Sequence, residues 1–139
     1  MPSEQELFDE LSFYTLAHGD PAFLHENSAD AWRAQHVDET TKPMAVIFAV
    51  MGLYLYLEKG FTGKQVQRVH MQLARSRKIW PSFSLPSDRG TMTVADVASV
   101  PPGVERDAAI HQWCSVVWKA WRGSREPIAA LLRNELDIR

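Results

Sequence analysis

Apolar residues recur three and four positions apart along most of the chain, which is the period of an amphipathic helix. Ser or Thr followed three residues later by Glu, Gln or Asp marks the expected start of three helices, because the two residues can cap each other's backbone N–H groups. The pattern predicts helices over about residues 3–18, 20–36, 43–59 and 62–78, a short helix at 93–98, a fifth long helix ending near 122 and a final one at 126–136.

The junction between the first two helices carries clear stop and start signals. Gly19 is expected to end the first helix in a left-handed conformation just after His18. Asp20 is expected to cap the second helix, with Pro21 at its first position, where the missing N–H of proline costs nothing.

One stretch of 14 residues, Met44–Leu57 (MAVIFAVMGLYLYL), is uncharged and almost entirely apolar. A membrane-spanning helix needs about 20 such residues, whereas a run of this length is typical of a buried core helix. We therefore expect no membrane span. A helix over about residues 43–59 should form the centre of the fold, with neighbours on all its sides.

Loop signals dominate from about residue 79 to residue 103, where Pro-containing pairs and an Asp-Arg-Gly turn interrupt any helical period. A connection of this length is expected to wrap the body of the protein through its apolar residues. The sequence shows no alternating strand pattern. The expected fold class is all-α: a single-domain bundle over residues 1–139, with five main helices plus a short one around the central apolar helix.

Composition adds few constraints. Hydrophobic residues make up 45% and charged residues 23%, as in an ordinary globular protein, and the net charge of -2 indicates no particular partner. Because Cys114 is the only cysteine, an intramolecular disulfide and a cysteine-based zinc cluster are both excluded. The acidic N-terminus lacks the basic-then-apolar order of a secretion signal, so we expect a cytoplasmic protein.

Three stretches together carry a family resemblance: LSFYTLAHGDPAFLHENSADAWRAQH, KGFTGKQVQRVHMQLARSRKIWPSF and WCSVVWKAW. They resemble a family of small bacterial proteins catalogued as a domain of unknown function, and the pattern His25, Gln35, His36 is the most distinctive part. The resemblance implies an all-helical fold and supplies no catalytic residue. The family tends to have Tyr where this chain has Trp32, which argues against a role there that needs a phenol.

The chain contains five histidines but none of the usual metal-binding spacings, such as HExxH or CxxC. His25, Trp32 and His36 fall on one stripe of the second helix. At 1.5 Å of rise per residue, His25 and His36 are roughly 16 Å apart, so they cannot share one ion. A metal at His25 must recruit ligands from other helices.

Two other histidines can approach His25. His18 lies across a short turn from it, and His70 lies on the fourth helix, which alternating helix directions would make roughly parallel to the second. Counted from the helix starts, His70 is about level with Ala29, roughly 6 Å along the axis from His25. His18, His25 and His70 are therefore the candidate ligands of a divalent metal, zinc or iron, with an open position for hydrolytic or Lewis-acid chemistry.

Further residues would complete this site. Asp20 or Glu26 would add an oxygen ligand, and a small molecule would bind between the helices against Tyr14, Trp32 and His36. The competing interpretation is that each histidine is a packed, hydrogen-bonded ring, and that His36 interacts with the C-terminal dipole of its helix. Whether the protein is an enzyme stays open.

A second hypothesis is a non-enzymatic interaction module. The tryptophan-rich helix near residues 113–121 and the loop over 80–85 would then form a homodimer or partner surface. His111 and Cys114 on the same helix are a weaker candidate for nucleophilic chemistry, because a cysteine among tryptophans usually packs as a small apolar residue.

A third hypothesis rests on charge. Residues 59–78 carry six bases and no acid, against nine acids and one base in residues 1–41, so helix 63–78 could bind nucleic acid or phosphate with Trp80 as a stacking platform. The near-neutral total charge instead favours mutual neutralisation of the two segments.

Overall fold

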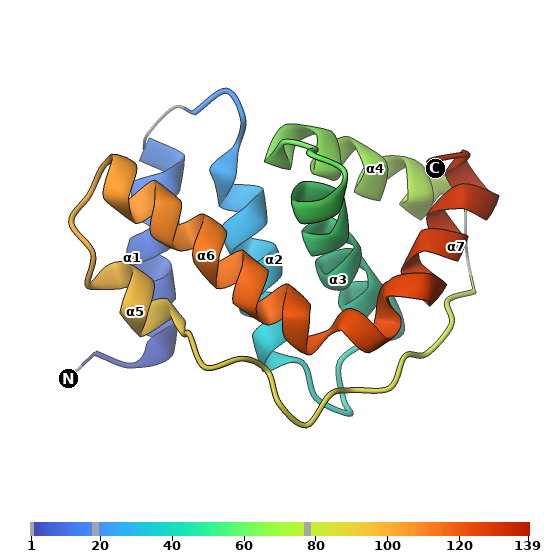
Figure 1. The fold of residues 1–139 in the computed structure, drawn as a ribbon, viewed down its shortest axis with the longest axis horizontal. Helices are drawn as coiled ribbons and strands as arrows, with labels where there is room; N and C mark the ends of the chain where they lie inside the picture. Colours follow the sequence, from blue (N-terminus) through green and yellow to red (C-terminus); the bar gives the residue numbers. More distant parts are fainter. Residues whose placement is uncertain (1, 18–19, 77–78) are drawn as a thin grey trace.

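Figure 1 shows the computed structural model of the protein, which describes residues 2–17, 20–76 and 79–139. Within these ranges every regular element is helical, so the all-α fold class is confirmed. The predicted end of the first helix, at His18 and Gly19, lies outside the described residues. In chain order the elements are α1 (Glu4–Ala17), α2 (Leu24–His36), α3 (Pro43–Glu58), α4 (Gly63–Ser76), α5 (Val94–Ala98), α6 (Val104–Ala120), the 3-10 turn η1 (Arg122–Ser124) and α7 (Arg125–Leu136).

The expected count of five main helices plus a short one is wrong. Over the described segments, six longer helices accompany the short α5. The sixth is α7, which corresponds to the final helix predicted over residues 126–136 and which η1 separates from α6. Trp121 ends α6 by donating its N–H to the carbonyl of Trp118, and the Ser124 N–H then donates to the Trp121 carbonyl, so the backbone tightens into a 3-10 turn before α7 begins.

The apolar helix α3 is central, as its sequence predicts. Residues 46–47 and 49–55 of this helix are buried, and α3 contacts α2, α4, α6 and α7. Pro43 occupies its first turn, and Gly60, with a left-handed φ of 71°, follows its last turn. None of the helices in the described segments combines the length and hydropathy that a membrane span requires. The core around α3 is one cluster with members from each of the α-helices.

The start of α2 differs from the prediction. Asp20 caps a turn instead of the helix, because its carboxylate accepts the N–H groups of Ala22 at 2.9 Å and Leu24 at 3.0 Å. Phe23 then adopts a left-handed conformation with a φ of 62°, and α2 begins at Leu24. Local sequence permits both outcomes, since an Asp side chain caps a turn as readily as a helix.

Three other predicted helix starts are confirmed by their caps. The Thr62 N–H donates to Gln65 Oε1 at 2.8 Å, and the Gln65 N–H donates to Thr62 Oγ1 at 3.2 Å. At the start of α5, the Thr93 N–H donates to Asp96 Oδ2 at 2.8 Å. Ser3 Oγ accepts a backbone N–H from the first turn of α1. The capping signals therefore fix these boundaries in the sequence itself.

Two glycines allow α2 to lie close to its neighbours. A Cβ atom on Gly52 of α3 would fall 1.9 Å from Asp30 Oδ2 of α2. A Cβ atom on Gly63 of α4 would fall 2.0 Å from the Phe23 carbonyl oxygen, just before α2. A side chain at Gly52 would displace the Asp30 carboxylate, and one at Gly63 would displace the backbone just before α2.

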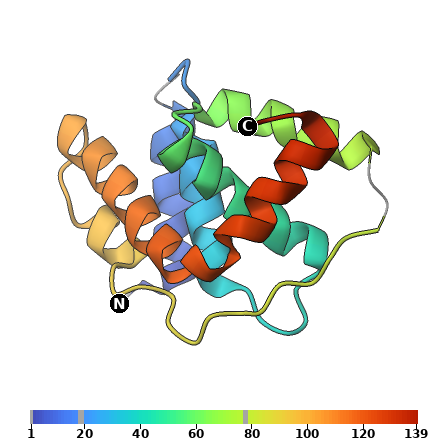
Figure 2. The ribbon, with the colours of Figure 1, turned by 45° about the vertical axis from the view of Figure 1, so that its right-hand side comes forward.

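From the contact at Gly63, α4 crosses α2 and α3 instead of running alongside them (Figures 1 and 2). The Lys64 N–H donates to the Ala22 carbonyl at 3.0 Å, so the start of α4 is fixed beside the start of α2. The roughly parallel arrangement expected for these two helices is therefore wrong. Alternating helix directions do not determine a crossing angle, which depends on where the close contacts lie.

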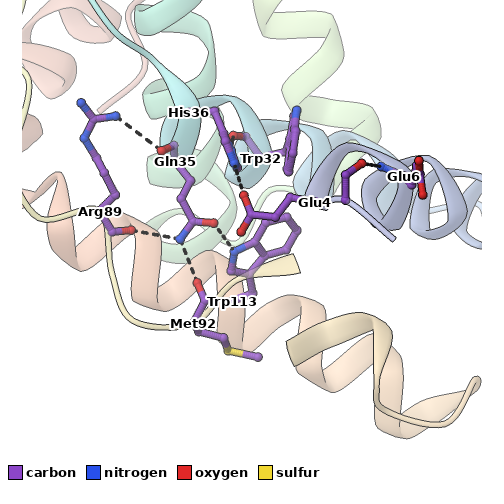
Figure 3. Close-up of polar contacts among 9 residues, drawn as sticks. Glu4, Glu6, Trp32, Gln35, His36, Arg89, Met92 and Trp113 are labelled. Carbon is purple, nitrogen blue, oxygen red and sulfur yellow. Dashed lines mark hydrogen bonds and ion pairs between the residues drawn. The ribbon is translucent and has the colours of Figure 1, made fainter. Parts of the chain in front are cut away.

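Residues 79–93, the irregular segment before α5, run along one edge of the molecule (Figure 2). The end of α2 holds it, because Gln35 Nε2 donates to the carbonyls of Arg89 at 3.2 Å and Met92 at 2.8 Å (Figure 3). Gln35 Oε1 also accepts the indole N–H of Trp113 at 3.0 Å. Arg89 in turn donates to the Val37 carbonyl at 2.7 Å. Polar bonds thus tie this segment to both α2 and α6.

Gly52→Ala is expected to destabilise the protein by about 1–3 kcal/mol, although Ala is the better helix former, because its Cβ overlaps the Asp30 carboxylate in a packed core. Gly123→Ala is the matched control, since a Cβ there meets nothing within 4 Å. Urea unfolding followed by circular dichroism measures both. Equal unfolding midpoints for the two variants would contradict the close approach of α2 and α3.

Candidate metal site

Three potential metal ligands converge where α2, α3 and α4 meet. Glu26 and Asp30 are four residues apart on α2 and therefore share one face of that helix, and His70 reaches this face from α4. One donor atom from each side chain lies within 4.8 Å of the other two. In the part of the chain that the structure describes, no other group of three His, Cys, Asp or Glu donors meets this distance.

The cluster is buried and poor in hydrogen bonds. Asp30 is 0% exposed and His70 is 9% exposed. Both Asp30 carboxylate oxygens lack a hydrogen-bond donor, and His70 Nε2 and Asn27 Nδ2 are buried without a partner among the described residues. His70 Nδ1 lies 4.0 Å from Glu26 Oε2. Buried polar atoms nearly always have a hydrogen-bond partner. Several buried polar atoms without a partner, close together, are therefore typical of a site that an ion or a water molecule occupies.

Burial also determines the charges in this cluster. It raises the pKa of the Asp30 carboxyl well above its usual range; the nearby Glu26 carboxylate acts in the same direction, and Arg33 acts against them. Burial lowers the pKa of His70, while the Glu26 charge and the Phe48 backbone carbonyl act against this. The metal-free cluster therefore favours a protonated Asp30 and a neutral imidazole, and the neutral imidazole is the form that ligates metals.

The structure places His25 outside this cluster. Its Nδ1 lies 3.2 Å from Thr15 Oγ1 of α1, and burial lowers its pKa. The α4 imidazole that was expected opposite His25 instead faces Glu26 and Asp30. Of the other predicted ligands, His18 lies outside the described residues.

Trp32 and His36, two of the three predicted ligand-binding residues, lie together at the end of α2 (Figure 3). Their ring centroids are 3.7 Å apart, and Trp32 also stacks on Phe8 of α1 at 4.7 Å. His36 Nε2 lies 2.9 Å from Glu4 Oε2, which ties the end of α2 to the start of α1. A pocket of about 270 Å³ at this end of α2 is lined by Trp32, Arg33, His36, Val37, Thr41 and Ala45.

Tyr14, the third predicted ligand-binding residue, lies elsewhere. Its hydroxyl donates to Asp107 Oδ1 at 2.8 Å and accepts the Gly103 N–H at 3.0 Å. The Arg106 guanidinium lies over its ring, 4.9 Å from the centroid. Tyr14 therefore joins α1 to the start of α6, and the structure does not bring it into the pocket at the end of α2.

Cys114 and His111 contact different neighbours. Cys114 is buried, its Sγ donates to the Asn27 carbonyl at 3.4 Å, and burial raises the pKa of its thiol. His111 Nδ1 lies 3.0 Å from the hydroxyl of Tyr56. This arrangement favours a packed cysteine over an activated nucleophile, because a reactive thiolate needs exposure and a lowered pKa.

The basic face of α4 is exposed at Lys64, Arg68 and Arg75. Trp80, the expected stacking platform beside it, packs edge-on against Phe48, with ring centroids 5.4 Å apart. The nucleic-acid hypothesis and the dimer hypothesis both stay predictions.

Asp30 is the residue of the cluster that sequence reasoning missed. Glu26 and His70 were candidates, whereas Asp30 follows Glu26 by one helical turn and stands next to the buried Ala31. Its position one helical turn after Glu26, which puts two carboxylates on one helix face, is the signal that could have identified it. Gly52 gave a second signal, as a glycine within an apolar helix indicates a close neighbour.

A family model described as "Family of unknown function (DUF5946)" matches residues 4–122. All three side chains of the cluster lie within this range, and α7 lies beyond it. Comparison with curated proteins and with solved structures found no match. The match confirms the predicted resemblance to a family of unknown function.

Asp30→Asn is expected to stabilise the metal-free protein at neutral pH. A carboxyl whose pKa is raised by folding contributes its full stabilisation of the folded state at pH values below its ordinary pKa of 3.8. This contribution is lost as pH rises through the folded pKa, and the free energy of unfolding then falls by at most about 1.4 kcal/mol per pH unit. The amide does not titrate, so the advantage of the variant should shrink towards pH 4. Unfolding in the presence of a chelator from pH 4 to pH 8 measures this difference, and a pH-independent difference would count against the buried acid.

Proposed function

We propose that this protein, which belongs to the DUF5946 family of unknown function, binds one divalent transition-metal ion between α2 and α4 through Glu26, Asp30 and His70. The supporting observation is the convergence of three donors from two helices, in which Asp30 and His70 present buried atoms without hydrogen-bond partners among the described residues. The predicted histidine site is thereby revised to one histidine with two carboxylates.

The donor set selects the class of metal. One imidazole nitrogen with two carboxylate oxygens suits zinc, iron(II) and manganese(II), whereas copper(I) prefers sulfur ligands. Calcium requires six to eight oxygen ligands, which this cluster does not offer. Two carboxylates also balance the charge of a divalent ion, which a buried site with a neutral imidazole needs.

Gly52 supports this site because it has no side chain. The Asp30 carboxylate lies against the bare Cα of Gly52, and Val66 of α4 packs beside the same position. These contacts leave Asp30 little room to rotate away from Glu26 and His70. A carboxylate held in this way loses little conformational entropy on binding an ion.

An ion with three protein ligands keeps a coordination position for water, which it can activate for hydrolysis as a Lewis acid. The pocket beside Trp32 and His36 does not include Glu26, Asp30 or His70 in its lining. The proposed function is therefore metal binding, with hydrolytic chemistry as the activity that a bound ion would supply.

Purified protein without an affinity tag is expected to bind one equivalent of zinc or manganese after dialysis, as measured by elemental analysis. Glu26→Gln, Asp30→Asn and His70→Gln should each weaken binding at least about tenfold, because each removes a charged or nitrogen ligand. Isothermal titration gives the affinities. A native protein that binds neither metal nor iron(II) under anaerobic conditions would overturn the proposal.

His25→Gln is the matched control. It makes the same substitution as His70→Gln, but at a ring on α2 that faces Thr15 and not the cluster. Its metal affinity should equal that of the native protein. Circular dichroism of each metal-free variant separates loss of a ligand from loss of the fold. If His25→Gln alone abolished binding, the predicted histidine ligand would replace the carboxylate cluster.

A further inference from the structure

Three aromatic rings from separate segments connect the cluster to the irregular segment that follows α4. The ring of His70 stacks on Phe48 of α3 with centroids 4.6 Å apart and planes 8° apart. Phe48 in turn receives the edge of Trp80, with centroids 5.4 Å apart and planes at 84°. Parallel and edge-on contacts are both favourable aromatic geometries, worth roughly 0.5–1.5 kcal/mol each beyond burial.

Phe48 is the aromatic ring that stacks on the His70 imidazole. His70 Nε2 has no hydrogen-bond partner among the described residues, and Nδ1 is 4.0 Å from Glu26, so polar contacts hold the imidazole only weakly. The stacked phenyl ring covers one face of the imidazole. Ligating histidines generally depend on such a neighbour for their orientation.

Trp80 occupies the end of the irregular segment nearest α4. The far end of that segment is already tied to α2, through the bonds of Gln35 to the carbonyls of Arg89 and Met92. At the near end, Trp80 is half-buried and its ring contacts Phe48. The orientation of the Phe48 ring therefore affects the position of Trp80 at this end of the segment.

We propose that Phe48 positions His70 for the metal ion and transmits occupancy of the site to Trp80 and the irregular segment. This inference rests on the proposed metal site. An ion on His70 fixes the imidazole plane, the stacked Phe48 ring follows that plane, and the edge contact passes the constraint to Trp80. The segment that crosses one edge of the molecule then responds to the ion although it supplies none of the three ligands.

Fluorine NMR of protein labelled with 5-fluorotryptophan tests the coupling. Zinc is diamagnetic, so a signal moves on titration only where the surroundings of a ring change. The Trp80 signal, identified by its loss in Trp80→Phe, should shift or sharpen. The signal of Trp118, whose indole N–H donates to Glu58 Oε2 at the end of α3, should stay in place.

Phe48→Leu is expected to weaken zinc binding about tenfold and to remove the response of Trp80 at saturating zinc. Phe83→Leu is the matched control, because it makes the same change within the irregular segment without touching the stack. It should preserve both the affinity and the Trp80 shift. Phe48→Tyr, which retains a flat ring, should restore most of the affinity that Phe48→Leu loses.

The outcomes separate the two proposals. If zinc fails to bind the native protein, both the metal site and the coupling fall. Zinc binding with an unmoved Trp80 signal, or with equal shifts of all five tryptophans, overturns the coupling alone. The titration of the native protein gives this answer even if Phe48→Leu does not fold.

Discussion

The close approach of α2 to α3 and α4 is the constraint on which the rest of the structure depends. Gly52 and Gly63 lack the side chains that would separate these helices; the Asp30 carboxylate lies against Gly52, and the Phe23 carbonyl lies against Gly63. Packing at this distance gains dispersion energy and excludes bulk solvent from Asp30, which is 0% exposed. The same contact that makes the core dense therefore forces an acidic group into it, beside an imidazole from another helix.

The fold was largely predictable because its signals are local. The pair Thr62 and Gln65 caps α4 by bonds between residues three apart, and the apolar run of α3 requires neighbours on every side. The start of α2 was not predictable in the same way. Asp20 bonds two nearby N–H groups in a turn that delays the helix to Leu24, and the same sequence signal fits either structure.

The site was only half predictable, since it depends on how distant helices meet. Sequence reasoning named Glu26 and His70 as candidates and missed Asp30, and no sequence pattern specifies a helix crossing. A parallel α4 would have brought His70 towards His25. The crossing fixed by Gly63 brings it to the carboxylates instead, and His25 turns to Thr15 on α1.

The hydrogen bonds of Gln35 affect the order in which parts of the chain can fold. Its side chain bonds to residues 54, 57 and 78 positions away, so one amide closes three long loops at once. Contacts between such distant residues form late, because the entropy of loop closure is lost before any bond compensates for it. The helices around α3 can assemble first, whereas the irregular segment reaches its final path only when α2 and α6 are already together.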